Sequence, residues 1–248
     1  MKLFGIVCGA VLACVFGWNP AVWAAEPAMP SQPAPMIVGA VFRFETGAWA
    51  EYDMLDKLRD QPYTLRVAVL EQEQVRRNWF SRRRPYRWME FDVQEPGQPR
   101  VVVKGLMQEL DDGPGDMREL VMQIEGYPNP LRLGPAWLRR NQEELVDVDL
   151  QWVDQRLDER EITHQGRTFT AWRVEATRED GEPVSATVSE ALPPFGLYQA
   201  ETPELRMTLR EWGGDAQSTI QGEPLGLSRW ILQQVRQAMN EADETPQP

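Results

Sequence analysis

The chain has 248 residues, with 26 basic and 38 acidic side chains and one histidine, so its formal net charge is −12 at pH 7. This acidic balance argues against a general nucleic-acid binder, whose phosphate contacts need clustered positive charge, and no nucleic-acid partner is expected. Beyond Cys8 and Cys14 no residue can form a disulfide, a thiolate metal ligand or a cysteine nucleophile.

Residues 1–24 predict an export signal peptide. Lys2 supplies the positive start, residues 3–16 form an apolar run, and Val22-Trp23-Ala24 is a small-residue cleavage site. The run is too short and too poorly flanked to be read first as a membrane span. Cleavage after Ala24 leaves 25 basic and 38 acidic side chains, a net charge of −13. We therefore expect an exported protein, located in the periplasm.

Lipid attachment at Cys14 is the alternative to soluble export. Val11-Leu12-Ala13 precedes that cysteine, as in a lipoprotein signal. However, the apolar character continues beyond Cys14, and Leu12 is bulky where small residues are expected. Soluble export is therefore the preferred prediction.

The remaining sequence predicts one folded domain between two disordered ends. Residues 25–36 contain four prolines and little that packs, which is typical of a disordered leader. Residues 37–242 are assigned to a single β domain, and residues 243–248 to a disordered tail.

Alternation of apolar and polar residues between turn signals predicts a sheet with one buried face. Pro135 suits the first turn of a helix over 135–145, and an apolar stripe predicts a second helix over 227–242 that docks on the sheet. The fold class is mainly β (α+β): one strongly curved antiparallel sheet of eight to eleven strands, an incomplete barrel with helices packed on it. Strands are expected over residues 49–54, 63–70, 86–93, 100–106, 119–124, 159–164, 168–176, 184–189 and 205–212.

Four segments resemble a known family. They are Gly47 and Trp49 with Glu51-Tyr52, the run Arg87-Trp88-Met89-Glu90, residues 101–106, and the turn over residues 193–197. Across residues 40–224 the chain resembles bacterial exported proteins related to the LolA-like and LolB-like periplasmic lipoprotein carriers. That resemblance implies a curved sheet whose apolar concave face is covered by helices. It also implies a pocket for the acyl chain of a lipidated partner, although many relatives have no assigned role.

Large apolar side chains on facing elements provide the candidate ligand site. Such residues line a cavity for an acyl chain or fill a core, and the alternation pattern is the same in both cases. The candidate ligand-binding residues are Trp49, Trp88, Phe91, Met122, Trp137, Trp172 and Leu209.

A second candidate site is the segment 76–88, where arginines alternate with aromatic residues between acidic flanks. Guanidinium forks pair with phosphate, and aromatic rings settle at lipid interfaces, so this segment is a candidate contact for an anionic membrane or an acidic partner. A solvated loop whose arginines pair with neighbouring carboxylates is the competing interpretation. The candidate contact residues are Arg76, Arg77, Trp79, Phe80, Arg82, Arg83, Arg84 and Arg87.

Catalytic and metal-binding patterns are weak. His164 lies beside a predicted Gln165-Gly166 hairpin turn, away from any nucleophile motif, so we expect an exposed turn residue. An acidic group between residues 143 and 158 lacks the spacing and the glycine of an EF-hand loop, and a solvated surface is the preferred interpretation. A pair of carboxylates for sugar hydrolysis stays open at this point. No catalytic residue, cofactor or metal is assigned.

These observations predict a non-enzymatic exported protein that binds a hydrophobic ligand or a lipidated partner. A periplasmic structural or protein-interaction module without a ligand is the first alternative, and a hydrolase is a distant one.

Overall fold

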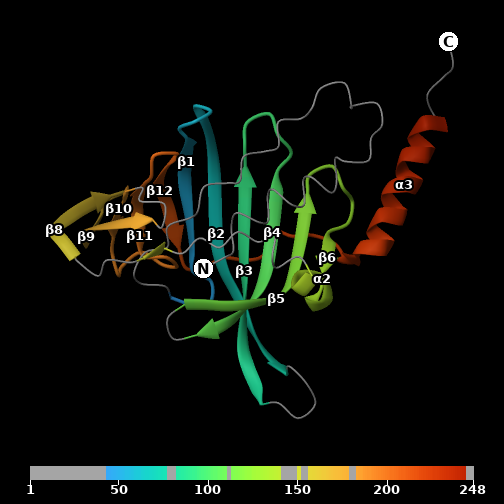
Figure 1. Ribbon diagram of the computed structural model, residues 1–248, viewed down its shortest axis with the longest axis horizontal. Coiled ribbons are helices and arrows are strands. Elements are labelled where there is room, and N and C mark those ends of the chain that lie inside the picture. Colours follow the sequence, from blue (N-terminus) through green and yellow to red (C-terminus); the bar gives the residue numbers. More distant parts are fainter. Residues whose placement is uncertain are drawn as a thin grey trace.

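The computed structural model describes residues 43–76, 82–110, 113–140, 150–151, 156–178 and 183–243 (Figure 1). These residues form one large, curved, unclosed sheet with few helices, which confirms a mainly β, antiparallel fold. The expected export signal, the leader and Cys14 lie outside the described residues and stay predictions. Among the described residues, no helix is both long and apolar enough to cross a membrane.

Thirteen strands build the sheet within the described part of the chain, more than the eight to eleven expected, because β6, β7 and β13 are too short to leave a periodic signal. In chain order they are β1 (Trp49–Asp56), β2 (Gln61–Arg76), β3 (Arg83–Gln94), β4 (Val101–Leu110), β5 (Gly113–Ile124), β6 (Leu131–Leu133), β7 (Leu150–Gln151), β8 (Arg156–His164), β9 (Arg167–Arg178), β10 (Pro183–Val188), β11 (Leu197–Glu201), β12 (Leu205–Gly213) and β13 (Leu225–Gly226).

The strands are ordered β13-β6-β5-β4-β3-β2-β1-β12-β11-β10-β9, and both β7 and β8 pair with β9. Most neighbours are consecutive in the sequence, as in a meander, and the pairing of β1 with β12 joins the two halves. The two-residue contact of β13 with β6 is parallel. Register shifts in β1, β2 and β4 are bulges or irregularities of the kind that increase local twist and bend a sheet, which agrees with its curvature.

The inner face of the sheet is apolar across its width. One cross-strand row runs through Val67, Phe91, Val103, Met122 and Leu131, all of them buried. The alternation expected for β2 and β3 therefore places their apolar residues correctly. Two core clusters share this face: a large one over β1–β4 and β9–β12, and a smaller one over β4–β6 with the two helices.

The outer face of the sheet is also partly buried, which differs from the single buried face that the alternation pattern predicts. Residues 214–222, named here the outer strap, follow β12 and cross the sheet towards β13 (Figure 1). Ala216 and Ile220 of the strap pack on an outer apolar cluster that contains Trp88 and Leu106. Glu90, which is only 1% exposed, accepts hydrogen bonds from the strap: 2.6 Å from Ser218 Oγ and 2.8 Å from both the backbone N and Oγ1 of Thr219.

The two helices in the described part of the chain lie where the sequence places them, but one docks differently. α2 (Pro135–Arg140) packs on β5, and residues 141–145 of its expected range lie outside the described residues. α3 (Leu227–Asp243) extends from the edge of the sheet beside β6 (Figure 1). The expectation that its apolar stripe docks on the sheet is wrong, because Ile231 and Val235 of that stripe face solvent.

Candidate functional site

The seven candidate ligand residues do not line one cavity. Phe91 and Leu209 lie in the large inner cluster with Trp172 at its margin, whereas Met122 and Trp137 belong to the smaller inner cluster. Trp49 and Trp88 belong to the outer cluster.

The prediction that Trp49 and Trp88 line one site with the other five candidate residues is therefore wrong. Side chains alternate along a strand, so Trp88 lies on the opposite face from Met89. The ring of Trp88 donates its Nε1–H to Glu73 at 2.7 Å, and Trp49 Nε1 donates to Asp215 at 2.9 Å. These two indoles hold the strap and the β2–β3 hairpin on the outer face.

The face of α3 that meets the sheet carries one tryptophan and several glutamines. Trp230 is buried, donates to the backbone oxygen of Asn129 at 3.0 Å and stacks on Tyr127 with 5.3 Å between ring centroids. Gln233 Nε2 donates to Asn129 Oδ1 at 2.9 Å. The helix is thus fixed by a partly polar flank, which leaves its most apolar side outward.

We name the outward side the α3 stripe. Its spacing of mostly four residues keeps one helix face apolar over about three turns. Leu232 is 58% and Met239 63% exposed, and the others are more than one-third exposed. A contiguous exposed apolar surface on one helix is typical of an interaction site. The stripe consists of Leu227, Ile231, Leu232, Val235 and Met239.

The arginine-rich segment is the distal part of the β2–β3 hairpin. We name its described residues, 72–76 and 82–86, the arm, and their register places Arg76 opposite Arg83. Arg76 and residues 82–84 are exposed. Arg77, Trp79 and Phe80 of the predicted contact set lie outside the described residues.

Arg87 is not part of this exposed set, and its prediction as a surface contact is wrong. Its side chain is buried on the inner face, where it donates to Glu109 Oε2 at 3.1 Å and to Thr46 Oγ1. The alternation that groups Met89 with Phe91 also places Arg87 on that face, so the sequence contained the signal.

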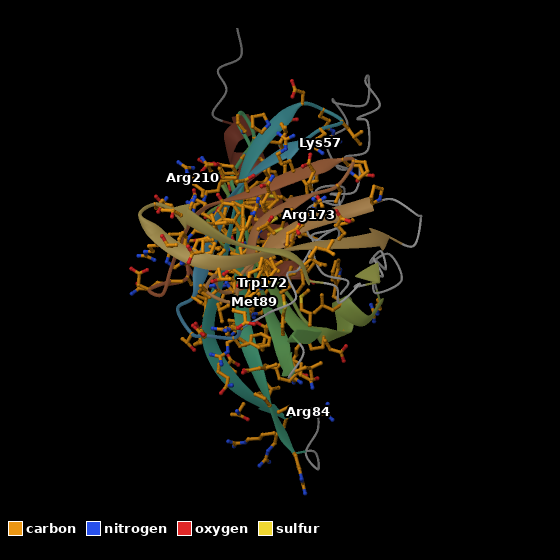
Figure 2. The ribbon with its side chains drawn as sticks, turned by 90° about the vertical axis from the view of Figure 1, so that its left-hand side faces the viewer. Lys57, Arg84, Met89, Trp172, Arg173 and Arg210 are labelled. Carbon is orange, nitrogen blue, oxygen red and sulfur yellow. The ribbon has the colours of Figure 1, made fainter. Side chains whose placement is uncertain are left out.

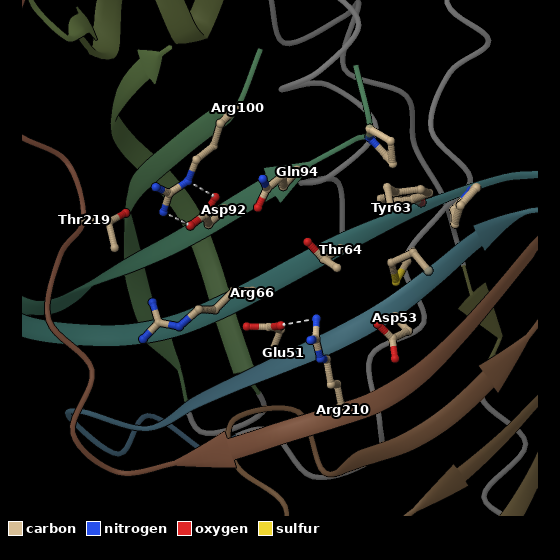
Figure 3. A pocket seen from close by; sticks show the side chains of 13 residues that line it. Glu51, Asp53, Tyr63, Thr64, Arg66, Asp92, Gln94, Arg100, Arg210 and Thr219 are labelled. Atoms are coloured by element: carbon tan, nitrogen blue, oxygen red, sulfur yellow. Dashed lines mark hydrogen bonds and ion pairs between the residues drawn. The ribbon is translucent and has the colours of Figure 1, made fainter. Parts of the chain in front are cut away.

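The outer face also carries an open polar groove of about 900 Å³ (Figure 3). Its charges are largely paired with one another: Arg210 Nη1 lies 3.0 Å from Glu51 Oε1, and Arg100 Nε donates to Asp92 Oδ1 at 2.9 Å. The hydrogen bond that Arg100 donates to Asp92 raises the pKa of Arg100. Internal pairing leaves this groove little charge to offer a ligand, so it is a weaker candidate than the arm.

His164 connects strands of the sheet through a hydrogen bond and ring contacts. Its Nε2 lies 2.9 Å from the backbone oxygen of Arg210, and its ring contacts those of Tyr198 and Trp212 at centroid distances of 5.6 and 5.7 Å. The adjacent turn is the predicted one, with φ of 49° at Gln165 and 76° at Gly166. His164 therefore ties the β8–β9 hairpin to β12 and is less exposed than expected.

The described residues hold no group of three or more His, Cys, Asp or Glu side chains that could bind a metal. Of the acidic group between residues 143 and 158, Asp158 lies in the described part of the chain. Ser189 Oγ donates to the backbone oxygen of Thr170, and Ser218 Oγ donates to Glu90, so both hydroxyls serve structural contacts.

Comparison with known proteins adds no family. No protein-family model matches the chain, and no curated protein matches it.

Proposed function

We propose that this chain is a non-enzymatic, exported protein that binds a hydrophobic ligand or a lipidated partner, as the LolA-like and LolB-like carriers do. The observation that carries the proposal is the α3 stripe. Five large apolar side chains face water on a helix that is already anchored through Trp230 and Asn129. A surface of this kind lowers the free energy of the system when apolar atoms of another molecule cover it.

The location of the stripe fits a lipidated partner better than a free ligand in a closed pocket. The stripe lies on the solvent side of α3, whereas the inner face of the sheet is filled by its own buried side chains. An acyl chain with part of the attached peptide offers an elongated apolar surface, which matches the length of the helix. The proposed partner is therefore an acylated protein, with a free fatty acid as its simplest analogue.

The first experiment measures binding of a palmitoylated, fluorescently labelled peptide by anisotropy. The triple variant Ile231→Gln, Val235→Gln and Met239→Gln should weaken binding at least tenfold, because each large apolar side chain contributes about 1 kcal/mol when covered. Its thermal midpoint should stay within about 2 °C of the parent, since the replaced side chains face solvent.

Leu58→Gln is the matched control, because Leu58 is also an exposed leucine, 72% accessible, but lies in the β1–β2 turn away from α3. The control should bind like the parent. Equal binding by the triple variant would contradict the proposal. Binding of an apolar protein surface without any affinity for acylated peptide would instead favour an interaction module with no lipid ligand.

A further inference from the structure

The arm extends well beyond the rest of the sheet. In Figure 1 β2 and β3 continue past the body of the molecule as a two-stranded ribbon, and in Figure 2 Arg84 lies at its far end, remote from Met89 and Trp172. Arg76, Arg82, Arg83 and Arg84 are all exposed there. The arm therefore holds four cationic side chains away from the body of a chain whose net charge is −12.

The register of the arm brings like charges together. Arg76 lies directly opposite Arg83, and Arg84 lies opposite Val75. Like charges in a directly opposed cross-strand pair destabilise the pairing. The folded protein thus tolerates a repulsion at the end of the arm that an external anion would relieve.

The carboxylates near the base of the arm are already engaged by other donors. Glu71 Oε1 lies 3.0 Å from Lys104 Nζ, Glu73 accepts from Trp88 Nε1, and Glu109 accepts from Arg87. Within the described ranges, no carboxylate forms an ion pair with any of the four exposed arginines of the arm. This pattern disagrees with the competing interpretation of a solvated loop neutralised by its own acidic flanks.

Hydrogen bonds favour the ionised form of Glu71, which pairs with Lys104. Burial acts to raise the pKa of Glu71, but the hydrogen bonds from its backbone and from Lys104 outweigh it and lower that pKa. Glu71 therefore stays ionised and paired at neutral pH.

We propose that the arm docks on the phosphate groups of an anionic lipid bilayer. Guanidinium groups pair with phosphate through two hydrogen bonds, and basic residues near an anionic membrane act almost independently of one another. A stable protein interface needs about 800 Å² per partner with an apolar centre, which the exposed arginines of a narrow ribbon do not provide. The negative charge elsewhere on the chain orients the approach, so that the arm meets the membrane first.

The test is co-sedimentation with vesicles of phosphatidylcholine containing 30% phosphatidylglycerol, beside vesicles of pure phosphatidylcholine, at low and at physiological salt. The variant Arg82→Gln, Arg83→Gln and Arg84→Gln should lose about fivefold in affinity for each arginine, with a flatter salt dependence. Its thermal midpoint should equal or slightly exceed that of the parent, because the substitutions remove repulsion.

The matched control is Arg132→Gln, Arg173→Gln and Arg206→Gln, which changes the net charge equally. Each of these arginines is ion-paired in the folded chain, with Glu119, Glu175 and Glu201 respectively. The control should keep most of the vesicle binding.

Three results would overturn this inference: no binding of the parent to anionic vesicles, an equal loss in the control, or a clear fall in the thermal midpoint of the arm variant. Binding to polyglutamate in place of vesicles would also overturn it and assign the arm to an acidic protein. Because the α3 stripe is intact in both variants, failure here leaves the binding of acylated peptide to be judged separately.

Discussion

At the scale of single residues, Tyr52 both stabilises and destabilises the inner core. Tyr52 is fully buried in the large cluster, and within the described part of the chain its hydroxyl has no hydrogen-bond partner. Burial raises the pKa of Tyr52, because the phenolate would lose its hydration. The ring stabilises the core while its hydroxyl lowers stability, since a buried polar group without a partner costs about 1–3 kcal/mol.

Tyr52→Phe should therefore raise the free energy of unfolding by about 1 kcal/mol. Chemical denaturation with urea measures this change, and the slope of the transition should stay constant. A loss of stability would show that the hydroxyl has a favourable partner and would contradict this description of the core.

At the scale of elements, the outer strap explains why part of the outer face of the sheet is buried. It covers apolar side chains of β2–β5, and Glu90 fastens it through donors on Ser218 and Thr219. A buried carboxylate needs all its hydrogen-bond donors, because removing them leaves the charge without compensation.

The double variant Ser218→Ala and Thr219→Val leaves Glu90 one backbone donor from the strap. We expect it to lower the free energy of unfolding by about 2–4 kcal/mol, measured by urea denaturation. Replacing Thr163 and Thr168 by valine is the control, because these hydroxyls form an exposed pair 2.9 Å apart, and it should cost less than about 0.5 kcal/mol. An equally small effect in the strap variant would show that Glu90 does not hold the strap.

Sequence periodicity predicts the long elements and misses those without a period. Alternation locates β1 to β5, β8 to β10 and β12, and the Gln165-Gly166 turn matches its hairpin. The strap is rich in Gly, Ser, Thr and Gln, so its sequence does not predict that it crosses a sheet. β11 and the two- or three-residue strands are likewise set by tertiary pairing rather than by local pattern.

The candidate surfaces were predictable to different degrees. The arginines of the arm are conspicuous in the sequence. Their lack of ion pairs with neighbouring carboxylates among the described residues depends on tertiary contacts, because Trp88 binds Glu73 and Lys104 binds Glu71. The apolar residues of the α3 stripe recur at helical spacing in the sequence, yet the orientation of the stripe depends on the hydrogen bond from Trp230 to Asn129. A helix pattern alone does not say which flank meets the sheet.

At the scale of the whole molecule, the two proposed surfaces are well separated. Figure 1 shows the arm extending downward from the middle of the sheet and α3 rising at its right-hand edge. A chain bound to a membrane by its arm would therefore hold the α3 stripe towards the aqueous side. This arrangement suits a protein that meets a lipidated partner near a membrane and keeps it accessible.

Native mass spectrometry of the protein, purified gently from the cells that produce it, tests the central claim most directly. We predict that a fraction of the parent protein carries the mass of a lipid or an acylated peptide, and that the variant Ile231→Gln, Val235→Gln and Met239→Gln loses this fraction while Leu58→Gln retains it. A clean unliganded mass for the parent, together with no uptake of added palmitoylated peptide, would contradict the claim that this chain binds hydrophobic or lipidated partners.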